Sequence, residues 1–189
     1  PEPTKAVAQP TDAPTYAAGS VVDFEDGNYS FIKVKESNVD SAETELSIVD
    51  FGGSKALKIA AADTSKIPYV AIDISSLAGD AVANVRSIEM DMGISHDSGK
   101  FYAASGICYY YVGEDNTEKE ATWSVYLEAK NPKRATFKLA DDENFVAGAK
   151  NVMIVTKETD NAAEPTAEGT ASVFYIDNIV LKDADGKEI

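Results

Sequence analysis

The sequence contains little cysteine and little histidine, and each shortage excludes a class of protein. Its 189 residues include one cysteine, Cys108, and one histidine, His96. A lone cysteine cannot form an internal disulfide, and the chain has no cysteine or cysteine-histidine framework for zinc. Two-histidine metal sites are excluded as well. A Ser-His-Asp triad would depend on His96 alone, which lies in the turn-rich loop Ser95–Gly99.

Cationic residues are also scarce. Lysine and arginine number 17 against 32 aspartate and glutamate residues, which gives a formal net charge of −15. Nucleic-acid binding depends on cationic contacts with phosphates, so this charge excludes it. The same sign disfavours anionic membranes and polyuronate substrates and favours a monomer. No apolar run approaches the roughly 20 residues that span a bilayer, so we expect no membrane insertion.

Residues 1–20 lack the apolar side chains that a core requires. Four of the seven prolines fall here: Pro1, Pro3, Pro10 and Pro14. Most of the other residues are threonine, alanine and small polar types, and such composition favours an extended, semi-rigid chain. We therefore predict a disordered linker over 1–20 and one domain over 21–189. Pro/Thr linkers are typical of modular secreted proteins, but a tail of no consequence would have the same composition.

From Val21 onward, short runs of β-branched and aromatic residues alternate with Gly, Asn, Asp and Ser. Such runs predict strands separated by turns. The predicted strands are Val21–Glu25, Tyr29–Val34, Glu45–Phe51, Ala56–Ala60, Tyr69–Ile74, Arg86–Gly93, Gly106–Val112, Thr122–Glu128, Arg134–Leu139, Asn151–Lys157 and Ser172–Leu181. No stretch shows sustained helical periodicity, although Ser76–Ala83 and Asp142–Lys150 could each form a single turn.

Several predicted strands alternate between apolar and polar residues. In Arg86–Gly93, Met90 and Met92 point to one face while Glu89 and Asp91 point to the other. This period of two indicates antiparallel sheets with one packed face and one hydrated face. About ten such strands in one domain predict an all-β fold, an antiparallel β-sandwich or jelly roll.

Aromatic residues gather in the middle of the chain. Seven lie within 26 positions: Phe101, Tyr102, Tyr109, Tyr110, Tyr111, Trp123 and Tyr126. Sugar rings stack on aromatic faces, and tyrosine adds a polar tip. Alternation places Tyr109 and Tyr111 on one strand face and Tyr110 on the other, so one set should be exposed. Tyr126 is the better surface candidate, while the position of Trp123 favours the core.

Two acidic residues offer an enzymatic alternative. Glu89 and Asp91 share a strand face about 7 Å apart, which is within the range of an inverting glycosidase pair. Among 32 acidic residues, however, such pairs arise by coincidence. The same polar face includes Lys138, so these three residues could instead orient sugar hydroxyls beside the tyrosines.

Three segments together resemble a known family. They are Val21–Gly27, which contains Phe-Glu-Asp-Gly; Gly52–Ile59, which contains Gly-Ser-x-x-Leu; and Phe174–Leu181, which contains Tyr-Ile-Asp-Asn-Ile. In this order they resemble the jelly-roll carbohydrate-binding modules of secreted polysaccharide-degrading enzymes. The resemblance frames the domain from Val21 to Leu181 and is not specific for one ligand.

The resemblance implies a structural calcium ion. Carried over by motif, the ligands are Glu25, Asp177 and main-chain oxygens near Ser54 and Lys55, and Asp23 could contribute. Calcium prefers six to eight oxygen ligands, and an ion between the first and last strands would fasten the chain ends. The alternative is that Glu25 and Asp177 are ordinary exposed acids or pair with a lysine such as Lys55.

The family's ligand groove implies a cleft formed by Arg86–Gly93, Gly106–Val112, Thr122–Glu128 and Arg134–Leu139. The candidate carbohydrate-binding residues are Tyr126, Tyr109, Tyr111, Trp123, Glu89, Asp91 and Lys138. We predict non-catalytic binding of a neutral plant polysaccharide (xylan, mannan or β-glucan, then starch) by a secreted or cell-surface protein with a linked glycoside hydrolase. The alternatives are a scaffold sandwich that binds a protein, and a small hydrolase.

Overall fold

The structure is a computed structural model that describes residues 21–34, 44–61, 69–94, 104–112, 117–127, 133–141, 147–148, 151–158 and 173–189. Over 104–112, 117–127 and 151–158 the description covers the backbone only. The predicted linker 1–20 and most of the predicted turn Asp142–Lys150 lie outside these residues. No helix in the described part is long and apolar enough to cross a membrane.

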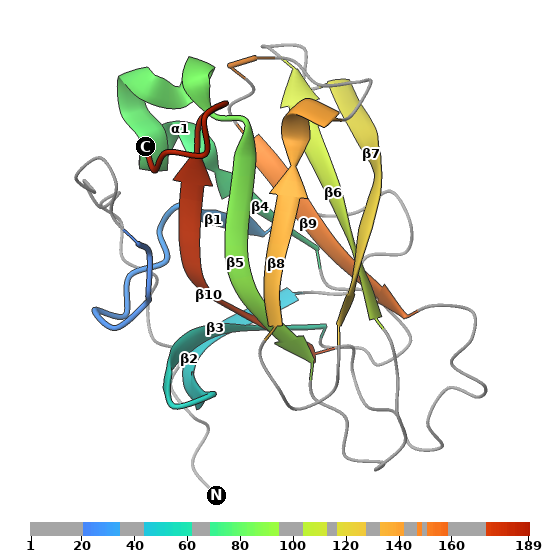
Figure 1. Cartoon of the computed structure of the whole chain (residues 1–189). Helices are drawn as coiled ribbons and strands as arrows, with labels where there is room; N and C mark the ends of the chain where they lie inside the picture. Colours follow the sequence, from blue (N-terminus) through green and yellow to red (C-terminus); the bar gives the residue numbers. More distant parts are fainter. Residues whose placement is uncertain are drawn as a thin grey trace, which may run out of the picture.

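Two five-stranded antiparallel sheets form a β-sandwich (Figure 1). The first sheet has the order β1 (Ile32–Val34), β4 (Tyr69–Asp73), β9 (Asn151–Glu158), β6 (Ala104–Val112) and β7 (Thr117–Leu127). The second has the order β2 (Thr44–Phe51), β3 (Ser54–Ala61), β10 (Val173–Lys182), β5 (Ser87–Ile94) and β8 (Lys133–Lys138). The predicted all-β antiparallel sandwich is therefore confirmed.

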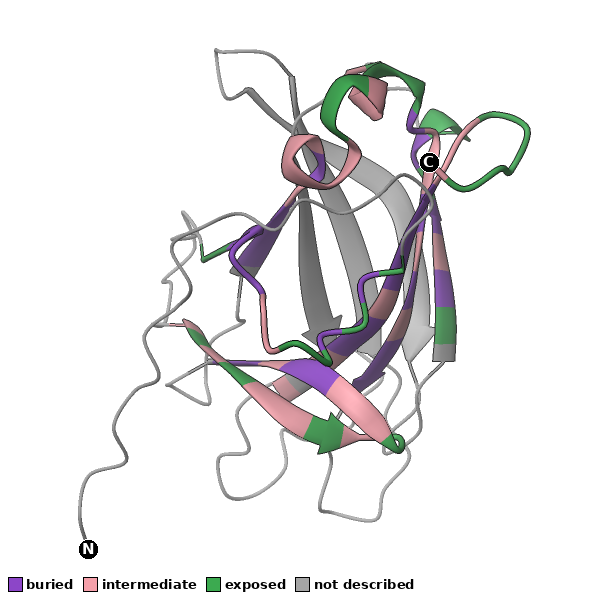
Figure 2. Ribbon diagram, turned by 90° about the vertical axis from the view of Figure 1, so that its left-hand side faces the viewer, coloured by how far each residue is buried: buried purple, intermediate pink, exposed green. Residues whose placement is uncertain are grey.

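The core lies between the two sheets and follows the predicted alternation. Ile88, Met90 and Phe137 from the second sheet join one buried cluster with Val70 and Ile72 from the first. Buried residues and partly buried residues both occur along the strands of the second sheet (Figure 2). In β5 and β8 buried residues alternate with more exposed ones, so each of these two strands contributes apolar area from one side to the shared interior.

Among the residues that the structure describes, helical structure is confined to short turns. α1 (Ile74–Ala78) and the 3₁₀ turn η1 (Gly79–Asn84) follow β4, close to the predicted turn Ser76–Ala83, and η2 (Leu139–Asp141) follows β8. Asp73 caps α1 by accepting a hydrogen bond from the Ser76 amide at 3.2 Å. Burial alone would raise the pKa of Asp73, but hydrogen bonds from Ser75 and Ser76 lower it.

The opening segment differs most from its prediction. Val21–Glu25 is not a strand, because Val22 makes only an isolated antiparallel bridge to Ile179. Phe24 has a φ of 55° and its carbonyl accepts a hydrogen bond from the Gly27 amide, so the chain turns away at once. The bridge nevertheless brings the opening segment beside the last strand, as the jelly-roll resemblance implies.

Candidate functional site

The last strand, β10, contains a β-bulge, and on the edge opposite β5 its pairing partner changes at this bulge. Its register with β5 shifts between the pairs Asp177–Asp91 and Val180–Glu89, so β10 has one extra residue there. Asn178 adopts a left-handed conformation with a φ of 50°. Before the bulge β10 pairs with β3, and after it Ile179 pairs with Val22. Asp177 therefore lies where the opening segment, β3 and β10 meet.

The two acids implied by the resemblance both contact the start of β3. The Ser54 hydroxyl donates to Asp177 Oδ2 at 2.6 Å, and the Lys55 amide donates to Glu25 Oε1 at 2.8 Å. Asp23 lies beside them and accepts from the Glu25 amide at 3.2 Å. The structure thus brings together all four of the residues for which a calcium role was predicted.

Asp177 differs from an ordinary surface acid. It is 5% exposed, and burial raises the pKa of its carboxyl, with Asp91 and Asp23 adding to the effect through their charge. The ammonium group of Lys55 does not relieve this charge, since it pairs with Asp50 at 2.6 Å. Hydrogen bonds from Ser54 and the Asn178 amide oppose the shift.

The side chains at this junction include carboxylate oxygens of the kind that calcium binds. Hard carboxylate, hydroxyl and carbonyl oxygens are the ligands that calcium prefers, and a cation would offset the charge gathered around Asp177. Within the described residues, no three acidic, histidine or cysteine side chains are grouped to hold a metal ion. Main-chain and water oxygens would therefore have to complete the coordination of an ion held by Asp177 and Glu25.

A network of charged side chains covers the outer face of the second sheet. Arg134 Nη1 donates to the Asn178 carbonyl at 2.7 Å and lies 3.4 Å from Asp91, while its Nη2 lies 3.4 Å from Glu89. Lys182 Nζ lies 2.8 Å from Glu89 Oε1. Every cation in this network therefore contacts a carboxylate, and Glu89 contacts two cations.

The hydrolase alternative receives no support from this arrangement. The hydrogen bond from Lys182, helped by the charge of Arg134, lowers the pKa of Glu89. A general acid in a glycosidase needs the opposite shift. Glu89 and Asp91 also lie on an outer sheet face that the cationic groups of Lys182 and Arg134 already occupy.

The predicted four-strand cleft is wrong. β5 and β8 belong to the second sheet, whereas β6 and β7 belong to the first. Glu89 and Asp91 alternate with the buried Met90, so they lie on the side of their sheet that faces away from the first sheet. These acids, and Lys138 on β8, therefore do not share one surface with the strands that contain the tyrosines.

The backbone register nevertheless aligns three of the predicted tyrosines. Tyr109 on β6 pairs with Met153 on β9, which pairs with Ala71 on β4. Tyr111 lies two residues further along β6, and Tyr126 pairs with Ser105, four residues before Tyr109.

Their rows alternate with those of Val70 and Ile72, both of which are fully buried. Tyr109, Tyr111 and Tyr126 thus occupy backbone rows different from those of Val70 and Ile72, and the row of Tyr109 includes Ala71, which is 5% exposed. Trp123 lies in the irregular segment of β7 between the pairs Ile107–Ser124 and Tyr109–Glu120. The side chains of these four residues lie outside the described part.

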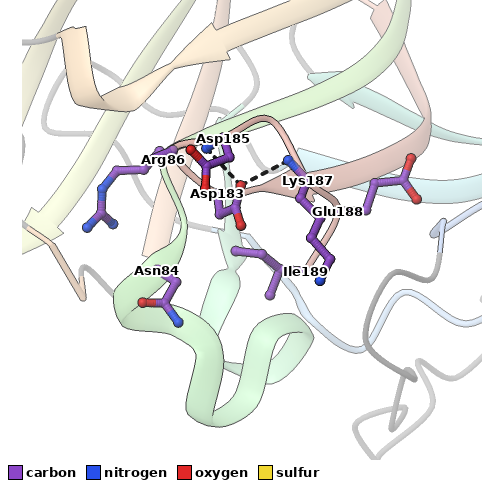
Figure 3. Close-up of a pocket in the computed structure, with 8 residues that line it drawn as sticks. Asn84, Arg86, Asp183, Asp185, Lys187, Glu188 and Ile189 are labelled. Carbon is purple, nitrogen blue, oxygen red and sulfur yellow. Dashed lines mark hydrogen bonds between the residues drawn. The ribbon is translucent and has the colours of Figure 1, made fainter.

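A polar hollow of about 410 Å³ lies at one end of the sandwich (Figure 3). Asn84, Arg86, residues 183–185 and residues 187–189 line it. The Asp183 carboxylate accepts hydrogen bonds from the amides of Asp185 and Lys187, both at 2.9 Å. No aromatic ring is among the described lining residues, so this hollow lacks a stacking surface for a sugar.

No family model and no curated protein sequence matches this chain. A solved module specific for non-crystalline cellulose, CBM28, is similar over 86% of this chain and 94% of its own, with 14% identity and a TM-score of 0.62. The xylan-binding CBM22-2 domain of Xyn10C from Paenibacillus barcinonensis covers 88% and 100%, with 16% identity and a TM-score of 0.54.

This chain has the β-sandwich fold of carbohydrate-binding modules. A mannan-recognising module, TmCBM27, agrees with this assignment over 87% of this chain and 96% of its own, with 14% identity and a TM-score of 0.52. The fold implied by the three sequence motifs is therefore confirmed. Because these modules recognise three different polymers, the fold alone does not select a ligand.

Proposed function

We propose that this protein binds a neutral plant polysaccharide without catalysis, through a tyrosine-lined groove on the first sheet. Xylan, mannan or β-glucan is the favoured polymer, followed by starch. The observation that carries the proposal is the register, which aligns Tyr109, Tyr111 and Tyr126 in rows that alternate with buried Val70 and Ile72. Aromatic rings in such rows would stack on sugar rings.

The fold and the charge support the same ligand class. Modules of this fold recognise cellulose, xylan or mannan. A net charge of −15 would repel a polyanionic polymer. Glu89, Asp91 and Lys138 are left out of the groove because they lie on the second sheet.

We further propose that the binding domain belongs to a secreted or cell-surface protein and is joined by residues 1–20 to a polysaccharide-degrading enzyme. Single sugar-hydroxyl hydrogen bonds contribute little net free energy, because they replace hydrogen bonds to water. Isolated binding would therefore be weak, and linkage to a second domain would raise the effective affinity. A structural calcium ion held by Glu25, Asp177 and main-chain oxygens near Ser54 would fasten the chain ends.

Affinity electrophoresis of the full chain in gels containing soluble xylan, mannan, β-glucan or starch tests the binding proposal. We expect one polymer to retard the wild-type protein and Tyr126→Ala to lose most of that retardation. Tyr175→Ala is the matched control, since Tyr175 stacks on Phe51 in the second sheet with ring centroids 4.0 Å apart. Absence of retardation by every polymer would instead favour a scaffold that binds a protein.

A further inference from the structure

Arg134 connects three elements around the β10 bulge. It is paired in register with Asp91 on the neighbouring strand, β5. Its guanidinium group extends past Asp91 and donates to the Asn178 carbonyl of β10 at 2.7 Å. Arg134 on β8 thus reaches across β5 to a main-chain carbonyl of β10. This hydrogen bond satisfies a carbonyl that the bulge leaves outside the regular hydrogen-bond ladder between strands.

Asn178 also connects Arg134 and Asp91 to Asp177. The Asn178 side-chain amide donates to Asp91 Oδ2 at 2.8 Å and lies 3.3 Å from Asp177 Oδ2. The Asn178 main-chain amide donates to Asp177 Oδ1 at 2.8 Å. Both ends of Asn178 are therefore fixed, its carbonyl by Arg134 and its side chain by Asp91, and both its amides contact the Asp177 carboxylate.

We infer that Arg134 is a positioning residue for the calcium site, and that it acts by fixing the Asn178 bulge and thereby the Asp177 carboxylate. This inference rests on the calcium ion proposed above. Groups that hydrogen-bond to metal ligands orient them, and their loss typically weakens metal affinity by about 10- to 100-fold. Arg134 contacts no atom of Asp177 in the described hydrogen bonds, so its influence passes through Asn178 and Asp91.

The sign of the effect separates positioning from simple charge. Arg134 carries a positive charge near the proposed cation, so its removal should tighten calcium binding if charge alone matters. If Arg134 positions Asp177, its removal should weaken binding. Lys138 provides a matched control, because it lies on the same strand, is exposed and carries the same charge.

The experiment is calorimetric titration of calcium into the calcium-stripped full chain. We expect Arg134→Met to weaken calcium binding by about tenfold or more. Lys138→Met should leave the affinity unchanged or slightly tighter. Arg134→Lys should be intermediate, since lysine can still donate one hydrogen bond to the Asn178 carbonyl but lacks the planar fork.

Three results would overturn the inference. They are equal or tighter binding by Arg134→Met, equal weakening by Lys138→Met, and absence of calcium binding by the wild-type protein. Near-ultraviolet circular dichroism without calcium checks that Arg134→Met is folded. If it is not folded, the calcium affinity of Arg134→Lys is compared with that of the wild-type protein, and a weaker affinity supports the inference. Affinity electrophoresis of the same proteins reports polysaccharide binding separately, so failure there is distinguishable from failure of the calcium site.

Discussion

Glu89 is a single carboxylate held in its charged form by two cationic side chains. Lys182 donates to it at 2.8 Å and Arg134 lies 3.4 Å away, and these contacts lower its pKa. A lowered folded-state pKa contributes stability above the pKa of the unfolded chain, and this contribution is lost as pH falls through the lowered value.

Glu89→Gln should therefore reduce the free energy of unfolding at neutral pH and have little effect in strong acid. The measurement is urea denaturation at pH 7 and at pH 2, where the wild-type protein should lose more stability on acidification than the variant. Glu188→Gln, in the exposed hairpin after β10, is the control and should retain the wild-type difference. An identical pH dependence of stability in Glu89→Gln and the wild-type protein would contradict the conclusion that Lys182 and Arg134 stabilise the charged form of Glu89.

Some residues of the candidate site could be recognised in the sequence and others could not. Glu25 and Asp177 stand within motifs, and the structure places both at the start of β3. Arg134 stands in no motif. Its role depends on a contact with Asn178, 44 positions away. Local alternation predicts that Arg134 faces outward, but only the order of strands in the sheet shows which residues it contacts.

At the scale of elements, the bulge in β10 depends on an unusual backbone conformation. Asn178 has a φ of 50°, which asparagine tolerates better than most residues and which is strained for a β-branched side chain. Asn178→Gly and Asn178→Val both remove the side-chain hydrogen bonds, but only valine also strains the backbone.

Asn178→Val should therefore unfold more easily than Asn178→Gly, by roughly 1–2 kcal/mol. Chemical denaturation of the two variants side by side gives this difference directly. Equal stabilities would show that β10 can abandon the left-handed conformation at little cost.

Strand positions were predictable because alternation is local, and β2, β5, β8 and β10 begin and end within one or two residues of their predicted bounds. The assignment of each strand to one of the two sheets was not predictable from the sequence. Alternation shows which side of a strand is buried, but both sheets bury one side against the same core. Nothing in that pattern separates β5 and β8 from β6 and β7, so the predicted cleft joined strands of different sheets.

At the scale of the whole molecule, binding of the proposed calcium ion would be coupled to folding. An ion that binds only the folded state stabilises it by about 2.7 kcal/mol when its free concentration is 100 times the dissociation constant. Removal of calcium with a chelator should therefore lower the melting temperature, and added calcium should restore it. Asp177→Asn should abolish this difference, whereas Asp183→Asn, in the hairpin after β10, should keep it.

The isolated bridge between Val22 and Ile179 also has a mechanical consequence. The two segments are antiparallel, so the chain leading into Val22 and the chain leaving Ile179 lie at the same end of the pair. Tension applied through these two connections would peel the segments apart one hydrogen bond at a time, instead of shearing several bonds together. The contacts from Glu25 and Asp177 to the start of β3 would be the next to carry the load.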